Sequence, residues 1–217
     1  MEVSTIVKRG LMISFEGVDG CGKSTQIAYV EEYLREQGYD VLRTREPGGC
    51  AISEKIREII LDIRNDGMNL HTEALLYAAA RAQLVEQVIL PALHQGKIVL
   101  CDRFVDSSAA YQGEARGMGM ETVLSYNAYA VEHCMPDHTF YLDFTPQAAR
   151  ERMNGRGEKD RMEAESMAFV EKVYAGYEKL CAAYPERYHR IDVSGTKEET
   201  RDVIREEIRE ILKQWQG

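Results

Sequence analysis

The sequence has little that would serve a disulfide framework, a metal cluster or a membrane anchor. Its five cysteines are odd in number and form no Cys-x-x-Cys pair, so we expect reduced thiols, as in a cytosolic protein. Its five histidines show no His-x-x-His or His-Glu-x-x-His spacing, which argues against a histidine metal site. The longest apolar run, residues 74–80, is far too short to cross a bilayer. The first ten residues lack the apolar core of a signal peptide, and we expect a cytoplasmic protein without membrane contact.

A basic surface is also missing. The formal net charge is -9 and the isoelectric point is about 5.2, whereas proteins that hold nucleic acid through charge usually carry a basic face. We therefore expect no nucleic-acid partner. A local anion site is still compatible with this charge, because a few arginines and backbone N–H groups can bind an anion against the overall sign.

Short apolar segments alternate with helical segments along the 217 residues. We expect strands at 11–16, 40–44, 97–101, 138–143 and 187–192. Strands that alternate with helices predict an α/β fold in which helices cover both faces of a parallel sheet. The chain shows no repeat and no linker, so we expect a single domain over residues 1–217.

The helical segments follow from apolar periodicity. We expect helices at 23–37, 53–63, 73–93 and 120–133, and two more that complete the chain together with the last strand. The last helix has one apolar face, which is formed by Ile204, Ile208, Ile211 and Trp215.

Residues 17–24 read GVDGCGKS and match the phosphate-binding pattern G-x-x-x-x-G-K-[ST] at every fixed position. The match follows the first expected strand and opens the first expected helix, as this loop requires. Its glycines let successive N–H groups turn toward phosphate oxygens, and the helix N-terminus adds the positive end of its dipole. Lys23 then reaches the β- and γ-phosphates, and the Ser24 hydroxyl can bind Mg²⁺. The loop alone does not distinguish a kinase from another nucleotide-binding protein.

Three charged clusters help to distinguish a kinase from other nucleotide-binding proteins. Asp102 and Arg103 end the third strand, where ligands of open α/β sheets bind; the aspartate can hold Mg²⁺ and the arginine can hold a phosphate. Arg45 follows the second strand in a Pro-Gly-Gly turn. The segment 152–161 is dense in cations, and beside a phosphate loop it predicts a lid that closes over ATP. Each cluster by itself is equally compatible with an ordinary solvated surface.

Four segments, together with the phosphate loop, resemble bacterial thymidylate kinases. They are TREPGG at 44–49, TEALLYAAARAQLV at 72–85, CDRFVDSSAAYQG at 101–113 and RGEKDR at 156–161. The resemblance covers nearly the whole chain in the family's order and spacing. It implies a P-loop nucleotide-kinase fold with a short lid at about 152–163. It also implies transfer of the γ-phosphate of ATP to dTMP with Mg²⁺, giving dTDP and ADP for dTTP synthesis, by a homodimer.

The resemblance further implies how each nucleotide binds. In the family, arginines that match Arg45, Arg57 and Arg103 surround the acceptor phosphate, and Asp19 lies near the 3′-hydroxyl. Arg81 and Gln112 match residues that bind the thymine edge, and Ser108 lies nearby. Tyr77 stands where the family usually has a phenylalanine stacked on thymine, and Tyr111 matches a tyrosine that excludes a 2′-hydroxyl. The residues expected to bind ATP are Gly17, Val18, Asp19, Gly20, Cys21, Gly22, Lys23, Ser24, Thr25 and Arg152.

The catalytic arginine is expected in the lid. Relatives carry it either in the phosphate loop after the acidic residue or in the lid, and here Gly20 follows Asp19 while Arg156 lies in the lid. The expected catalytic residues are thus Lys23, Arg103 and Arg156, with Ser24 and Asp102 at the metal. How much each of Arg152, Arg156 and Arg161 contributes to catalysis stays open. Two alternative functions also stay open. One is a kinase whose acceptor is a different monophosphate or a nucleoside, and the other is a nucleotide-dependent switch without catalysis.

Overall fold

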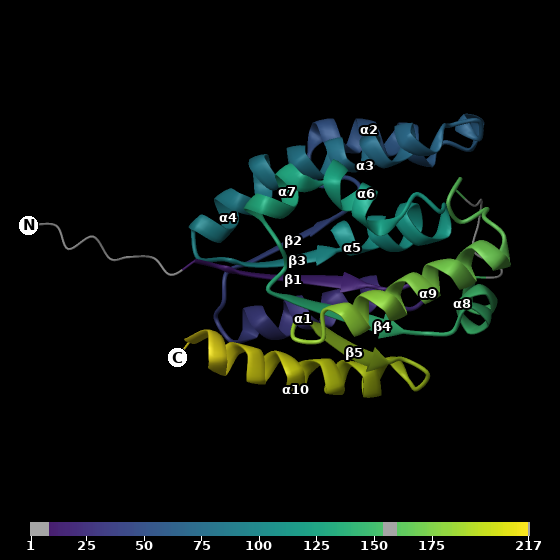
Figure 1. Ribbon diagram of the computed structural model, residues 1–217. Coiled ribbons are helices and arrows are strands. Elements are labelled where there is room, and N and C mark those ends of the chain that lie inside the picture. Colours follow the sequence, from purple (N-terminus) through teal and green to yellow (C-terminus); the bar gives the residue numbers. More distant parts are fainter. Residues whose placement is uncertain (1–8, 154–159, 217) are drawn as a thin grey trace, which may run out of the picture.

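The computed structural model describes residues 9–153 and 160–216, which are built around one five-stranded sheet (Figure 1). The strand order is β2-β3-β1-β4-β5 and all pairs are parallel, which confirms the predicted α/β fold. The strands are β1 (Leu11–Glu16), β2 (Val41–Arg45), β3 (Ile98–Asp102), β4 (His138–Asp143) and β5 (Tyr188–Asp192).

Burial explains this order. Every residue of β1 is buried, as expected for a central strand with both faces covered, whereas the edge strands β2 and β5 are each buried only at their first and fourth residues. The register pairs Phe15 of β1 with Asp102 of β3, and Arg45 of β2 with that same Asp102. The carboxyl ends of the three strands therefore meet at one edge, where the phosphate loop begins.

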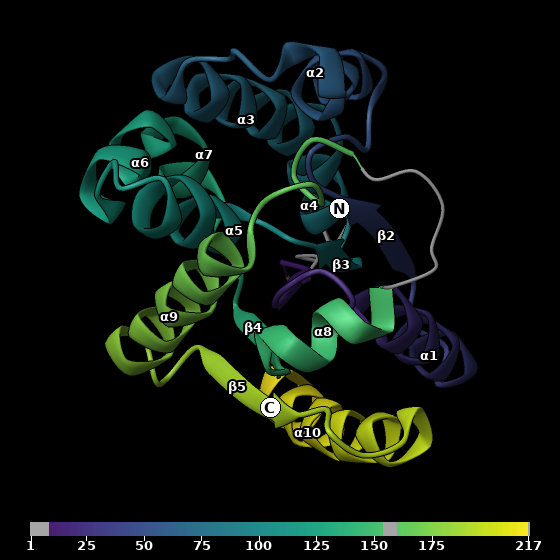
Figure 2. The same cartoon turned by 90° about the vertical axis from the view of Figure 1, so that its right-hand side faces the viewer.

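Helices cover both faces of the sheet. Figure 2 shows α1 and α10 on one side, and α5, α7 and α9 on the other. On the first side, the predicted apolar face of α10 is buried at Ile204, Ile208 and Ile211, while Trp215 is half-buried at the rim. The helices are α1 (Lys23–Glu36), α2 (Ala51–Leu61), α3 (Leu70–Leu84), α4 (Leu90–His94), α5 (Val105–Ser108), α6 (Met120–Tyr126), α7 (Ala128–His133), α8 (Pro146–Met153), α9 (Met167–Ala183) and α10 (Lys197–Gln216).

Two helical segments differ from the expectation. The helix expected at 73–93 joins α3 to α4 through a π-helical turn, Val85–Ile89. The helix expected at 120–133 is interrupted at Asn127, whose side-chain amide donates to the carbonyl of Val123 and accepts from Arg81. A side chain that bonds the backbone locally competes with the helix, and here a distant arginine fixes it in that role.

One helical stretch had not been expected at all. Residues 105–115 form α5 followed by the π-helix Ala109–Ala115, and nearly all of this stretch is buried. It follows β3 directly and carries the SSAAYQ segment to the sheet edge. None of the helices in the described residues combines the length and the apolar composition that a bilayer crossing needs.

Candidate active site

The phosphate loop joins β1 to α1. Gly17, Gly20 and Gly22 have φ values of 140°, 86° and 103°, which favour glycine, and a Cβ at Gly17 would lie 2.7 Å from the Leu142 carbonyl oxygen. Lys23 Nζ donates to the carbonyl oxygens of Gly17 and Val18, at 3.0 Å each, and the side chain is buried. The charge of Lys23 is therefore held inside the curl of the loop, beside the predicted phosphate site.

Ser24 and Asp102 meet at the sheet edge. The Ser24 hydroxyl donates to Asp102 Oδ2 at 3.0 Å, and both residues line a cavity of about 370 Å³ that opens above the loop. Hydroxyl and carboxylate oxygens are hard ligands of the kind Mg²⁺ takes together with water and phosphate oxygens. In the described part of the chain, no group of three or more His, Cys, Asp or Glu side chains could hold a metal alone. The pair thus fits an Mg²⁺ that draws its other ligands from a nucleotide and from water.

Arg103 occupies the centre of the edge with an unusual backbone. Its φ is 72°, the one positive value among the described non-glycine residues. Its Nη2 donates to Asp19 Oδ1 at 2.5 Å and to the Tyr111 hydroxyl at 3.2 Å. Its Nη1 donates to the hydroxyls of Ser107, at 3.0 Å, and Tyr177, at 3.2 Å. Three residues that the sequence predicted for the site, Asp19, Arg103 and Tyr111, therefore form one hydrogen-bonded group.

A buried acid that the sequence analysis did not anticipate supports this group. Glu16, the last residue of β1, accepts from the Phe104 N–H at 2.7 Å, from the Ser107 hydroxyl at 2.6 Å and from the Tyr177 hydroxyl at 2.9 Å. Burial, and next the nearby charge of Asp106, raise the pKa of Glu16 to about 7, although Arg103 and these hydrogen bonds oppose the shift. Its place directly before the glycine loop was the available signal.

Cations converge on the large cavity above the phosphate loop. Arg45, Arg57 and Arg103 line it together with Lys23. Arg45 also pairs with Glu54 at 3.0 Å, and Arg57 donates to the Pro47 carbonyl oxygen at 2.9 Å. Burial and then the charge of Arg45 lower the pKa of Arg57, which an anion in the cavity would reverse.

A second cavity, of about 150 Å³, continues from the first. The two share Asp19, Glu46, Arg57, Arg103 and Glu163. The second cavity is also lined by every residue predicted for the nucleoside of the acceptor, which are Tyr77, Arg81, Ser108, Tyr111 and Gln112.

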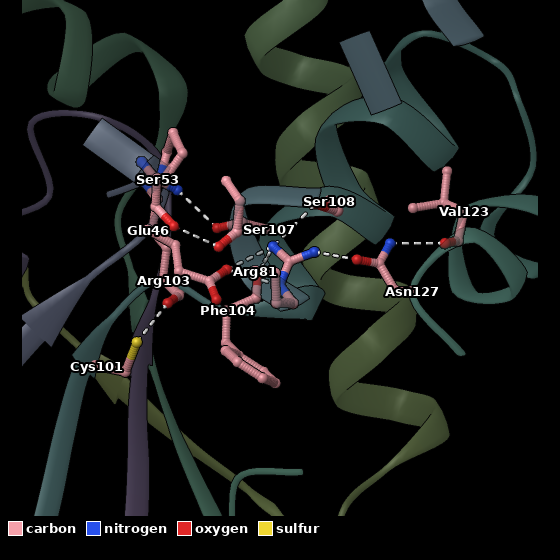
Figure 3. A network of polar contacts seen from close by, with 12 residues as sticks. Glu46, Ser53, Arg81, Cys101, Arg103, Phe104, Ser107, Ser108, Val123 and Asn127 are labelled. Carbon is pink, nitrogen blue, oxygen red and sulfur yellow. Dashed lines mark hydrogen bonds and ion pairs between the residues drawn. The ribbon is translucent and has the colours of Figure 1, made fainter. Parts of the chain in front are cut away.

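Most polar groups in this second cavity are already oriented by the protein. Gln112 Nε2 donates to Glu73 Oε1 at 2.9 Å, and Glu73 also pairs with Arg116. Arg81 is only 1% exposed and donates to Glu46, Ser108, Asn127 and the Phe104 carbonyl (Figure 3). Glu46, Glu73 and Asn127 were not predicted for the site, because nothing in the sequence connects them with Arg81 or Gln112.

The structure describes residues 152, 153 and 160–163 of the segment predicted to form a lid. Arg156, the predicted catalytic arginine, lies outside the described residues. Arg152 lies in the last turn of α8, with its guanidinium 4.1 Å from the centre of the Phe144 ring, and its Nη1 donates to the Gly20 carbonyl at 3.4 Å. Arg161 pairs with Glu73 at 2.6 Å and donates to the Ile60 carbonyl at 2.7 Å, so it ties its own segment to α2 and α3.

A further cavity of about 240 Å³ borders the outer side of the phosphate loop. It lies between Gly22, Thr25 and Arg152 on one side and the segment before and at the start of α10 on the other, with Val193 and Lys197 in its wall. The sequence does not indicate this wall, since residues 193–200 carry no phosphate-binding or aromatic signal. Its position suits the nucleoside end of a nucleotide whose phosphates lie in the loop.

Comparison with known proteins agrees with this geometry. The family model described as thymidylate kinase matches residues 15–212, a range that contains every candidate site residue. The chain is 54% identical over 184 residues to the thymidylate kinase of Thermoanaerobacter sp. strain X514, which covers 85% of this chain and 90% of the relative. It is 48% identical to that of Oceanobacillus iheyensis, covering 94% and 89%, and 47% identical to that of Bacillus velezensis, covering 93% and 98%. The chain belongs to the thymidylate kinase family.

Proposed function

We propose that this protein transfers the γ-phosphate of ATP to dTMP, giving dTDP and ADP. The observation that carries the proposal is the junction of two cavities at Asp19 and Arg103. One cavity is walled by the phosphate loop and cations, and the other by aromatic and amide side chains. A donor in the first and an acceptor in the second would present their phosphates to each other across Arg103.

ATP is proposed to bind along residues Gly17 to Thr25. Its nucleoside end would lie in the cavity beside Arg152 and residues 193–200. Mg²⁺, which would supply charge neutralisation between the phosphates, would be held by Ser24 and Asp102. Lys23 stabilises the negative charge that develops on the phosphoryl oxygens.

The acceptor phosphate is proposed to bind to Arg45, Arg57 and Arg103. Its attacking oxygen is already anionic, so the reaction needs no strong general base. The protein's part is to hold both nucleotides in line and to offset the repulsion between them. The number of cations at the cavity junction favours a phosphorylated acceptor over a free nucleoside.

The base and sugar are proposed to lie in the smaller cavity. Tyr77 would stack on thymine, while Arg81 and Gln112, with Ser108 nearby, would bind its polar edge. Tyr111 would stand beside the sugar's 2′ carbon and exclude a ribonucleotide, and Asp19 would accept from the 3′-hydroxyl. Arg156, in a lid at about 152–163, would complete the charge stabilisation and help to exclude water.

We further propose a cytoplasmic homodimer that is a single domain over residues 1–217. Exposed isoleucines on and just after α2 support a second copy as partner, because Ile52 and Ile59 of α2 and Ile63 of the following 3₁₀ turn are 52%, 47% and 59% exposed. Leu70 and Leu75 of the adjoining α3 extend this surface, with exposures of 41% and 51%. Contiguous exposed apolar surface of this kind commonly marks a protein interface.

A coupled assay of ADP release, with ATP·Mg²⁺ and a panel of nucleoside monophosphates, tests the proposal. We expect rapid turnover with dTMP and much slower turnover with dCMP, dAMP and dGMP. A strong preference for another monophosphate would support kinase activity but contradict dTMP as the acceptor. Absence of turnover with every acceptor, together with nucleotide-dependent binding of a protein partner, would favour the alternative of a nucleotide switch without catalysis.

A further inference from the structure

Glu46 is a buried acid in the wall of both cavities. It follows β2 directly and is 5% exposed. Its Oε2 accepts from Arg81 Nε at 2.7 Å and lies 2.6 Å from Arg81 Nη2. Its Oε1 is buried without a hydrogen-bond partner among the described residues. A buried carboxylate of this kind is retained at an energetic cost, since burial raises its pKa to about 7 against the pull of Arg81.

Asn127 holds Arg81 from the opposite side. Its Nδ2 donates to the Val123 carbonyl oxygen at 2.8 Å, which leaves Oδ1 facing Arg81 Nη1 as an acceptor (Figure 3). Arg81 Nη2 donates in addition to the Phe104 carbonyl at 3.2 Å and to the Ser108 hydroxyl at 3.1 Å. The guanidinium is thus fixed in its plane by groups from the β2 end, the β3–α5 segment and the α6–α7 junction.

This arrangement leaves Arg81 with little freedom. A guanidinium has five N–H groups in a fixed fork. Four of these N–H groups have acceptors among the described residues: the one on Nε, both on Nη2 and one of the two on Nη1. One Nη1 N–H therefore remains for a ligand in the cavity that Arg81 lines. Because arginine stays charged and only donates, a base atom that faces this group must be an acceptor.

We propose that Glu46 is a positioning residue that, together with Asn127, fixes Arg81 so that its one unused N–H selects a pyrimidine with an oxygen at C4 over one with an amino group. The inference rests on the proposed function, in which Arg81 binds the thymine edge. Glu46 supplies the compensating charge that keeps the guanidinium buried, and Asn127 fixes its rotation. If Glu46 were lost, Arg81 could turn toward solvent and its selection of the C4 oxygen would weaken.

The test is a cycle between one protein group and one substrate atom. Wild type and Glu46→Gln are compared on dTMP, dCMP and 4-thio-dTMP, which keeps the N3–H and the 5-methyl group of thymine and replaces only the C4 oxygen, by sulfur, a weaker hydrogen-bond acceptor. Glutamine keeps the shape of Glu46 and removes its charge. We expect kcat/KM for dTMP to fall by about 10- to 100-fold, as for other hydrogen bonds to a charged group. For the analogue without the C4 oxygen it should fall by less than about threefold, because the atom that Arg81 selects is absent.

Base preference separates positioning from a purely structural role. The dTMP-to-dCMP ratio of kcat/KM should shrink by at least about tenfold in Glu46→Gln, because a site that pairs a polar group strongly rejects its mismatch. Ser53→Ala is the matched structural control. The Ser53 hydroxyl is buried and donates to the Ala80 carbonyl at 2.7 Å, next to Arg81 but outside the cavity wall. It should lower the free energy of unfolding without changing the base ratio.

The outcomes are distinct. If wild type does not phosphorylate dTMP, the proposed function itself fails. If wild type prefers dTMP and Glu46→Gln loses the same factor on all three nucleotides, only the positioning role is overturned. If Glu46→Gln does not fold, Asn127→Ala decides by the same ratios, with a reduced base preference expected and an unchanged preference contradicting the inference.

Discussion

Arg103 Nη2 lies 2.5 Å from Asp19 Oδ1, and this ion pair joins the phosphate loop to the end of β3. Burial alone would raise the pKa of Asp19, but Arg103 and Lys23 outweigh it and lower the pKa to about 2. Asp19 therefore stays ionised through the neutral range. All four N–H groups on Nη1 and Nη2 of Arg103 have protein acceptors, so an acceptor phosphate would either bind the Nε–H of Arg103 or share a terminal N–H with one of these acceptors.

Asp19→Asn should separate the two expected roles of this carboxylate. We expect kcat/KM for dTMP to fall by about 10- to 100-fold, because the amide is a weaker acceptor for the 3′-hydroxyl. The loss should be much smaller with 3′-deoxy-dTMP, which has no such hydroxyl. Steady-state kinetics on both nucleotides checks this. An equal loss on both would assign Asp19 to Arg103 alone.

Arg156→Ala tests the lid arginine that the sequence predicts. We expect kcat to fall by about 10³-fold with little change in the KM of either nucleotide, as when a cation that stabilises a transferring phosphoryl group is removed. Lys159→Ala is a matched control in the same segment and should retain most of the activity. Near-normal kcat in Arg156→Ala would remove it from the catalytic set.

The buried Glu16 predicts how stability depends on pH. Its pKa is raised from 4.5 to about 7, so between these values the folded protein binds more protons than the unfolded chain. The free energy of unfolding should therefore fall as pH rises through this window and level off above about 7. The contribution of Glu16 is at most about 3 kcal/mol. Urea unfolding at pH 5 and pH 7.5 measures the difference.

Glu16→Gln isolates this contribution from those of other groups. The amide cannot ionise, so the fall in stability between the two pH values should be smaller than in wild type. The variant should also raise the KM for dTMP, because Ser107 and Tyr177, which bond both Glu16 and Arg103, would be reoriented. Identical pH dependence in the two proteins would show that Glu16 is not the titrating group.

The phosphate loop and the strands around it could be predicted because each depends on local signals. Glycine spacing defines the loop, and short apolar segments define buried strands such as β1 and β3. The fold class then follows from their alternation with helices. In the same way Asp102, which ends β3, could be placed near the phosphate-loop motif that contains Ser24, since that motif follows β1 and the ends of these parallel strands meet.

The supporting residues could not be predicted because their roles depend on distant partners. Glu46 meets Arg81 across 35 positions, and Glu16 meets Tyr177 across 161. The break at Asn127 has the same origin, since Arg81 fixes a side chain that local periodicity assigned to a continuous helix. Such long-range polar contacts have no periodic signature, and only the packed structure reveals them.

Gly176 of α9 sets how closely this helix packs on the π-helix that carries Tyr111 and Gln112. A Cβ at Gly176 would lie 2.9 Å from Ala110 Cα and 3.1 Å from Glu114 Cβ. Gly176→Ala would gain up to about 1 kcal/mol in helix propensity. We expect the overpacking cost of about 1–3 kcal/mol to exceed this gain, so the free energy of unfolding should fall. Displacement of Tyr111 should also raise the KM for dTMP while the KM for ATP stays unchanged.

Gly67→Ala is the matched control for this prediction. Gly67 has no atom within 4 Å of an added Cβ and has no positive φ, so its substitution should leave stability and both KM values nearly unchanged. Chemical denaturation and steady-state kinetics on the two variants give both readouts. A more stable Gly176→Ala with normal KM for dTMP would mean that α9 can move away without disturbing Tyr111. The acceptor site would then be held by Glu16 and Asp19 rather than by helix packing.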